Sequence, residues 1–230
     1  YSYMMVYAKS NGETLSDHTE NALNVFESIR LLLPHIPQIC SVDDFWKHLF
    51  LGVFFHDFGK VAVGFQKSLD GQEWNYRHEI LSSSFFLNVP LPHEYDKAGA
   101  LAIISHHYGC AYLAENYRTY GIGGDAGKQR WREKVVEMEQ NQEHLYSLID
   151  KLQAWSIRYL GEEIKLPQDV VSVRNCKDAM ELCVRAIRNS DEQELFISSF
   201  PDRSYLLFLR GLVIACDHLS SANKKMILPG

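Results

Sequence analysis

Apolar residues recur along most of the chain with the three-to-four-residue spacing of a helix face. Residues 15–33 show it clearly, with Ser16 or Asp17 as the expected N-terminal cap and Pro34 after the last turn. The pattern predicts further helices over residues 41–59, 75–89, 93–109, 128–160, 176–188 and 203–222. No stretch alternates polar and apolar residues for long enough to predict a sheet. We therefore expect an all-α fold.

The expected boundaries rest on capping residues. The second helix should begin at Ser41 or Asp43 and end at Gly59, a residue type typical of helix C-termini. Residues 128–160 are charged and amphipathic, and they predict one long helix or a pair of helices. The segments expected to form loops are residues 61–75, 115–127 and 161–175.

Composition indicates one domain that spans residues 1–230. The chain is 46% hydrophobic and 23% charged, which is enough to form a core. Its five cysteines form no CxxC motif, which indicates a reducing compartment, and no apolar run reaches the roughly 18 to 20 residues that span a bilayer. With no signal peptide at the start, we expect a soluble, cytoplasmic protein.

The formal net charge of −6 argues against a general polyanion-binding surface. Divalent ions in a cleft supply their own positive charge, however, so an acidic enzyme can still bind a phosphodiester. Residues 115–134 interleave basic and aromatic side chains, which could track a single strand, but following glutamates favour a solvated helix face. Within this segment, GIGGDAGK at residues 121–128 lacks the spacing of a phosphate-binding loop, because Ile122 and Gln129 occupy key positions.

The chain contains ten histidines, and several of them lie at or near the expected helix ends. Each alone has an ordinary explanation as a cap or a half-buried core residue. Asp217 is more informative, because it follows the apolar run LVIAC and a buried carboxylate needs a partner, often a metal. His218 should face away from Asp217 by about 100° on a helix, so we do not expect it to be a ligand. The histidines interpreted as ordinary surface or core residues are His35, His48, His93 and His144.

The remaining histidines and aspartates form a candidate metal-binding set. It consists of His18, His56, Asp57, His78, His106, His107 and Asp217. Imidazole nitrogens with carboxylates suit Mn, Fe, Co, Ni or Zn, whereas an all-oxygen set would suit Mg or Ca. Seven ligands exceed the needs of one ion but suit two, with Asp57 able to bridge them. A pair of ions of this kind polarises a phosphoryl group and lowers the pKa of a water, which predicts hydrolysis of a phosphate ester.

The order H…HD…H…HH…D resembles that of the HD-domain metal-dependent phosphohydrolases. More narrowly, FFHDFGKVAVGFQ, RHEILSS, ISHHYG and LVIACDHLSSA resemble the HD nuclease domain of the CRISPR-associated helicase-nuclease of type I interference. The resemblance extends from His18 to Ser221 and implies an HD-domain helical bundle with a two-metal cleft between helices. The chain departs from the family pattern in having His218 after Asp217.

The resemblance also implies roles for individual residues. One ion would be held by His18, His56, Asp57 and Asp217, and the second by Asp57, His78, His106 and His107. Two divalent transition-metal ions are implied, with Fe, Mn, Co or Ni favoured over Mg or Zn. Asp57 and Lys60 would be catalytic, although Lys60 could equally be a charge that suits the helix dipole. Ser220 and Ser221 could contact substrate or serve only at the helix end.

The implied activity is cleavage of single-stranded DNA, as an endonuclease and in some cases an exonuclease. The chain has no helicase motifs, so the resemblance implies a helicase domain or subunit and an RNA-guided CRISPR surveillance complex as partners. The chain would then be a separate nuclease subunit or the N-terminal part of a longer nuclease-helicase polypeptide. Two alternatives are an HD-family nucleotidase that acts on small nucleotides and an inactive HD fold with a regulatory role.

Overall fold

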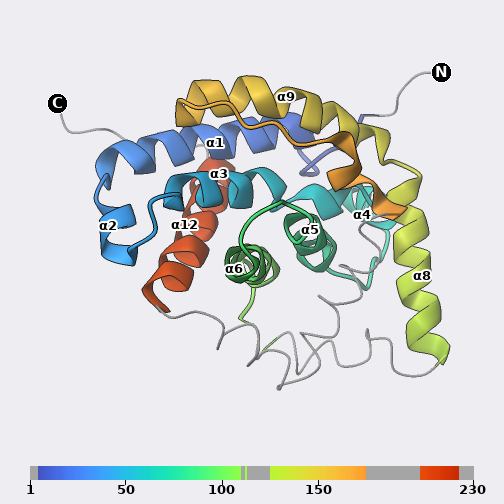
Figure 1. The fold of residues 1–230 in the computed structure, drawn as a ribbon. Helices are drawn as coiled ribbons and strands as arrows, with labels where there is room; N and C mark the ends of the chain where they lie inside the picture. The colour runs from blue at the N-terminus through green and yellow to red at the C-terminus, as the bar shows by residue number, and fades with distance from the viewer. Residues whose placement is uncertain (1–4, 110–111, 113–124, 175–202, 223–230) are drawn as a thin grey trace.

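The computed structural model of the chain describes residues 5–109, 112, 125–174 and 203–222. This part of the chain is helical and contains no β-strand, only an isolated bridge between Tyr7 and Thr14 (Figure 1). The predicted all-α class is therefore confirmed. The helix expected over residues 176–188 and the segment 115–124 lie outside the described residues.

The described part of the chain contains eleven helical segments. Their bounds are α1 Leu15–Leu32, α2 Ile36–Cys40, α3 Phe45–Phe55, the 3-10 helix η1 Phe58–Val61, α4 Val63–Leu69, α5 His78–Phe86, α6 His93–Ile104, α8 Asp125–Glu139, α9 Glu143–Leu160, the 3-10 helix η3 Gln168–Val171 and α12 Arg203–Ser221. Among the described helices, none combines the length and the apolar character needed to cross a bilayer.

Helix α3 lies at the centre of the bundle. It contacts α1, α5, α6, α9 and α12, and all but two of its residues are buried. A helix that is apolar on every side is stable only when other helices cover it. In Figure 1, α1 and α9 cross above α3, whereas α5 and α6 are seen end-on below it. This arrangement brings the C-terminal end of α3 into the middle of the molecule.

The first helix begins at a cap that differs from the expected one. Thr14 is the N-cap, and its hydroxyl accepts a hydrogen bond from the Asp17 backbone N–H (3.0 Å) and donates to the Asp17 carboxylate (2.7 Å). Asp17 is thus the partner of the capping residue, and Ser16 lies inside the first turn. The expected cap at Ser16 or Asp17 was wrong by two or three residues.

The second expected helix is interrupted earlier than the sequence indicated. Helix α3 ends at Phe55, and the chain turns at Asp57 into η1. Gly59 lies inside η1 and does not have a positive φ, so it is not the expected C-terminal cap. Asp44, rather than Ser41 or Asp43, precedes the first turn.

Other boundaries also differ. The expected loop 61–75 contains the helix α4, which has no buried residue and therefore gave only a weak apolar pattern. Helix α6 ends at Ile104, before the tandem histidines. The charged segment 128–160 is a pair of helices, α8 and α9, and Gly161 closes α9 with a positive φ of 87°.

Candidate metal centre

Five separate elements bring the seven expected ligands together. His18 lies in the first turn of α1, His78 is the first residue of α5 and Asp217 lies near the end of α12. His56 and Asp57 follow α3, and His106 and His107 follow α6. Potential ligand atoms lie within 4.8 Å of one another in two groups, His18–His56–Asp57–Asp217 and Asp57–His78–His106–His107. These are the two sets implied by the family resemblance.

Asp57 lies between the two groups. Its Oδ2 is 3.0 Å from His18 Nε2, and its Oδ1 is 3.1 Å from His78 Nε2. Lys60 Nζ is 2.6 Å from Oδ2, and Asp217 Oδ1 is 3.2 Å from the same His18 nitrogen. Each oxygen of Asp57 therefore faces a different group of ligand atoms, which is the geometry of a bridging carboxylate.

Two of the histidines are oriented by the helices that precede them. His56 Nδ1 lies 2.6 Å from the carbonyl oxygen of Val53, and His106 Nδ1 lies 2.5 Å from that of Ile103. A carbonyl oxygen can only accept, so in both rings Nδ1 carries the proton and donates. The lone pair is then on Nε2, which is the nitrogen that faces the centre.

The other two buried histidines are backed by carboxylates. His18 Nδ1 lies 3.6 Å from Glu13 Oε1, and His78 Nδ1 lies 3.5 Å from Glu79 Oε2. Glu79 is fully buried, which is rare for a glutamate. Neither contact is a hydrogen bond, since His18 Nδ1 and Glu79 Oε2 have no hydrogen-bond partner among the described residues. Carboxylates and backbone carbonyls near Nδ1 are nevertheless the usual neighbours of metal-binding histidines.

The atoms that face the centre are otherwise unsatisfied. These atoms are the Nε2 atoms of His18, His56, His78 and His106 and both carboxylate oxygens of Asp57. Some lie close to another polar atom, but none has a well-aligned hydrogen-bond partner among the described residues. Leaving a buried polar atom unpaired costs about 1–3 kcal/mol. Nitrogen and oxygen lone pairs that converge in this way fit divalent transition-metal ions.

The pKa values of His18 and Asp57, in the first group of candidate ligands, are strongly shifted by their neighbours. Burial disfavours a charge on His18, but the carboxylates of Asp217 and Asp57 outweigh it and raise the pKa of His18 to about 9. Burial also opposes ionisation of Asp57, whereas His56 and Lys60 hold its pKa well below the ordinary value. Asp57 is therefore ionised at neutral pH. The His18 ring must lose its second proton before Nε2 can act as a ligand.

The tandem histidines are neutral at physiological pH. Burial, together with the neighbouring His107 and His56, holds the pKa of His106 well below its ordinary value. Burial and the proximity of His78 lower the pKa of His107 to about 4. His107 is only half-buried, and its Nδ1 is 3.9 Å from Asp217 Oδ2. Its side chain is 26% exposed, compared with 6% for Asp217.

Hydrogen bonds lock the turn after α3 to α5. The Gly59 backbone N–H donates to Ser82 Oγ (2.8 Å), and the Ser82 hydroxyl donates to the His78 carbonyl oxygen (2.9 Å). Ser82 is fully buried. The position of Asp57 is thereby tied to that of His78, although they are far apart in the sequence.

Arg210, on α12, holds the backbone just before the tandem histidines His106 and His107. Its guanidinium donates to the carbonyl oxygen (2.8 Å) and hydroxyl (2.9 Å) of Ser105, the residue before His106. Sequence reasoning missed this arginine, and it missed Glu13 and Glu79. One signal was available for Arg210, which lies two turns before Asp217 and hence on the same face of α12.

The remaining expected site residues differ in placement. Lys60 is buried, with its ammonium against Asp57. The Ser220 hydroxyl donates to the Asp217 backbone carbonyl (2.8 Å), whereas Ser221 Oγ lies 3.4 Å from Asp217 Oδ1. His218 is exposed, but it has a ring nitrogen within 4.8 Å of ligand atoms of His107 and Asp217, so it does not face fully away.

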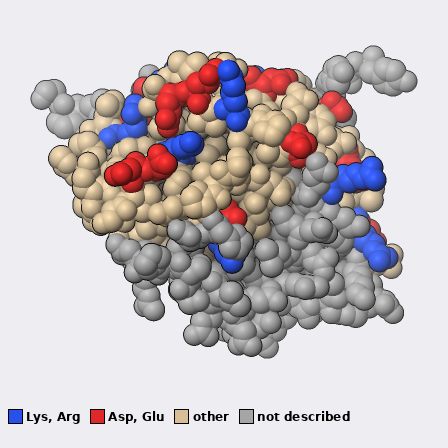
Figure 2. All heavy atoms as spheres, in the orientation of Figure 1, with Lys and Arg blue, Asp and Glu red and all other residues tan. Residues whose placement is uncertain are grey.

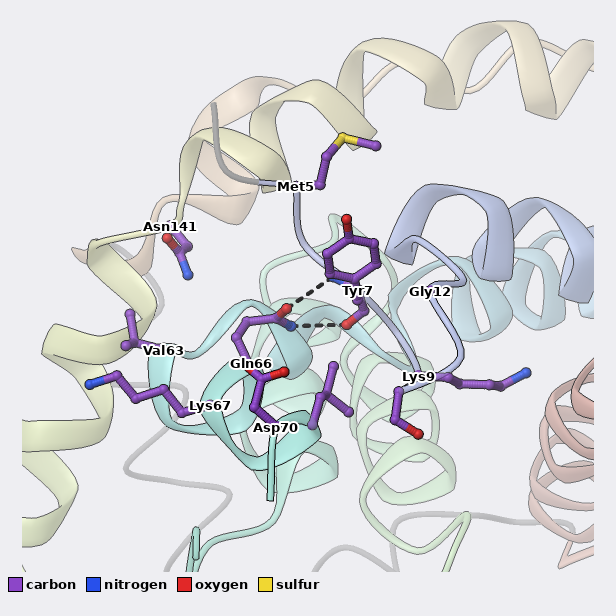
Figure 3. A pocket seen from close by; sticks show the side chains of 11 residues that line it. Met5, Tyr7, Lys9, Gly12, Val63, Gln66, Lys67, Asp70 and Asn141 are labelled. Atoms are coloured by element: carbon purple, nitrogen blue, oxygen red, sulfur yellow. Dashed lines mark hydrogen bonds between the residues drawn. The ribbon is translucent and has the colours of Figure 1, made fainter. Parts of the chain in front are cut away.

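Other features of the described residues lie apart from this cluster. His48, expected to be an ordinary histidine, is buried against Tyr205. A groove of about 350 Å³ is lined by Tyr7, Val63 and Gln66 but by none of the seven candidate ligands (Figure 3). The Gln66 side chain accepts from the Tyr7 backbone N–H and donates to the Tyr7 carbonyl oxygen. It also donates to the Lys60 carbonyl oxygen (2.6 Å), so Gln66 stabilises the backbone at the end of η1.

Comparison with known proteins adds no further information. No family model matches the chain, and no curated protein or solved structure is significantly similar to it. The functional interpretation therefore rests on the residues of the chain and their geometry.

Proposed function

We propose that the protein is a metal-dependent phosphodiester hydrolase of the HD-domain type that cleaves single-stranded DNA. The orientation of the histidines carries the proposal. Four imidazoles from four different helical segments converge, with Nδ1 of His56 and His106 against backbone carbonyls and Nε2 of His18, His56 and His78 within 3.4 Å of one shared carboxylate, Asp57. A buried ion-pair network would not require a common ring orientation, whereas ligands of a dinuclear centre do.

The ligand sets assign a task to each side chain. His18, His56, Asp57 and Asp217 would hold one ion, and Asp57, His78, His106 and His107 the other. Bound there, two ions would supply Lewis-acid activation of the phosphoryl group and of a nucleophilic water. Lys60 keeps Asp57 ionised and places a positive charge beside the reacting phosphate. The half-buried His107 marks the side from which a phosphodiester reaches the centre.

The substrate is proposed to be an unwound strand. On the face shown in Figure 2, lysine and arginine side chains lie next to aspartate and glutamate rather than in a basic stripe. Duplex and single-stranded DNA are both usually bound with the help of basic side chains, and the net charge is −6, so bound ions would have to supply the positive charge at the centre. We accordingly propose that a helicase domain or subunit, recruited by an RNA-guided CRISPR surveillance complex, delivers the strand.

Cleavage of circular single-stranded DNA tests this function. The purified chain is loaded with Mn, Ni or Co and incubated with the circle, and a parallel reaction contains a panel of deoxynucleoside triphosphates. Linearisation and degradation of the circle are expected, because the circle has no ends. Phosphate release from the triphosphates alone would instead identify a nucleotidase. Metal uptake with neither reaction would identify a binding module.

A further inference from the structure

One aromatic ring lies against both neighbours of the Asp57 carboxylate. The ammonium nitrogen of Lys60 lies 5.7 Å from the centre of the Phe65 ring, and the Phe65 and His78 rings meet edge to face with centroids 5.4 Å apart. Lys60 approaches Oδ2 of Asp57 (2.6 Å), and His78 approaches Oδ1 (3.1 Å). Phe65 therefore contacts a partner of each oxygen of the proposed bridging carboxylate.

The position of the Lys60 ammonium is not determined by its own side chain. A lysine has a flexible four-carbon stem, so its charge takes the place that its surroundings favour. Asp57 attracts the ammonium, and so do the π-electrons of the Phe65 ring. The attraction to an aromatic ring is larger where water is scarce, and Lys60 is only 7% exposed. Together these two contacts favour one position of the charge, beside Asp57.

Helix α8 holds Phe65 in place. Glu137 Oε2 accepts hydrogen bonds from the Gly64 backbone N–H (2.8 Å) and from the indole N–H of Trp74 (3.1 Å). The Trp74 ring meets the Phe65 ring edge to face, with centroids 5.7 Å apart. The other oxygen of Glu137 is paired with Lys134 Nζ (2.5 Å). The backbone next to Phe65 and the ring beside it are thus bound to the same carboxylate.

Gly64 permits this close approach. A Cβ on Gly64 would lie 2.2 Å from two atoms of the Trp74 ring and 2.5 Å from Glu137 Oε2. A larger residue at this position would therefore displace the indole and the carboxylate that hold Phe65.

We propose that Phe65 is a positioning residue, which holds the Lys60 ammonium beside Asp57 and is itself held in place by Glu137 of α8. A phenyl ring offers no ligand atom to a metal ion, so Phe65 acts through Lys60. This inference rests on the proposed function, which places the Lys60 charge beside the reacting phosphate. The contact between the ring and the ammonium needs no bound ion and can be measured without one.

A double-mutant cycle on the metal-free chain tests the contact. Urea unfolding is measured for the wild type, Phe65→Leu, Lys60→Met and the double variant. Both substitutions keep an apolar side chain of similar length, so the coupling between them reports mainly the attraction of the charge to the ring. We expect the combined loss in the unfolding equilibrium constant to be about fivefold smaller than the product of the single losses, as for one cation–π contact. Additive effects would overturn the proposal.

Two further substitutions serve as controls for this cycle. Phe65→Tyr keeps the aromatic ring and should retain the coupling with Lys60→Met. Phe208→Leu makes the same change at another half-buried phenylalanine, which lies on α12 about 13 Å along the helix from Asp217, and its effect should add to that of Lys60→Met. Equal coupling in the Phe208→Leu cycle would indicate a general loss of packing and would contradict a specific role for Phe65.

Turnover of bis(4-nitrophenyl) phosphate by the Mn-loaded chain tests the consequence for the reaction. Phe65→Leu should lower kcat about fivefold, with KM and metal content at the wild-type level, because the Lys60 charge is then less well placed. Glu137→Ala should change kcat in the same direction, since it releases Gly64 and Trp74. In the Lys60→Met background neither substitution should lower kcat further.

A fall in kcat that persists in the Lys60→Met background would show that Phe65 does not act through Lys60, and the proposal would be wrong. A wild-type chain that hydrolyses no phosphodiester would instead refute the proposed hydrolase. The unfolding cycle would still decide whether Phe65 positions Lys60, so the two failures are distinguishable.

Discussion

The backbone of His78 closes over Gly59 so tightly that no larger residue fits between them. A Cβ placed on Gly59 would lie 2.0 Å from the His78 carbonyl oxygen and 3.0 Å from Leu81 Cβ. Gly59 is therefore required for close approach rather than for a left-handed conformation. Asp57 lies two residues before Gly59, so this contact sets how closely Asp57 approaches His78 in the second group of candidate ligands.

The first prediction follows from this contact. Gly59→Ala must push η1 away from α5, so it should lower the free energy of unfolding by about 1–3 kcal/mol and reduce metal content. Thermal unfolding and elemental analysis after dialysis measure the two effects. Gly211→Ala is the control, because nothing lies within 4 Å of its new methyl group and α12 should gain slightly. Full metal content in Gly59→Ala would contradict the prediction.

The bridging position of Asp57 gives a second prediction, about stoichiometry. Asp57→Asn should lose most of both ions, falling from about two per chain toward zero, because each of its oxygens serves one group. Asp217→Asn should lose only the ion of the first group. Elemental analysis distinguishes the two outcomes, and His35→Gln, at an exposed position outside the cluster, should keep both ions. Two ions in Asp57→Asn would refute the bridge.

A third prediction concerns the two interpretations of Lys60. Lys60→Met keeps the buried stem and removes the charge, so metal content should stay and the turnover rate should fall about 100-fold, as for loss of one electrostatic contact to a transition state. Hydrolysis of bis(4-nitrophenyl) phosphate measures the rate. If Lys60 only complements a helix dipole, the rate will remain at the wild-type level.

The fourth prediction is a pH dependence of stability that comes from His48. Burial lowers its pKa to about 4, and the ring accepts or donates a hydrogen bond at Tyr205. The folded state thus binds fewer protons than the unfolded state, whose histidine pKa is about 6.5. The stabilising contribution is complete above pH 6.5 and is lost as the pH falls toward 4. Between pH 7 and pH 5 this should amount to about 2 kcal/mol.

Urea unfolding at the two pH values checks this contribution. His48→Asn keeps a polar atom near the position of Nδ1 but does not titrate, so its unfolding free energy should depend less on pH than that of the wild type. The difference between the two proteins isolates His48 from the histidines of the metal centre. Parallel pH curves for both proteins would show that His48 does not cause the effect.

The sequence determined the fold class and the identity of the candidate ligands. Helix α1 was predicted to within a residue at its C-terminal end, because its apolar face repeats over several turns. The order of histidines and aspartates also marked the residues that converge, since side-chain chemistry is visible in the sequence. The ends of α3 and α6 were not predictable in this way, because there the backbone is held by partners distant in sequence, such as Ser82 and Arg210.

Only the tertiary structure decided which atoms of those residues face one another. The His78 ring lies between Glu79 and Asp57, and the His18 ring lies between Glu13 and the carboxylates of Asp57 and Asp217. The close fit of Gly59 against His78 and the contact of Lys60 with the Phe65 ring are likewise properties of the packed helices. Periodicity records which face of a helix is buried, but not which distant residue lies against it. For that reason the sequence named the candidate ligands, and packing determined how they face one another.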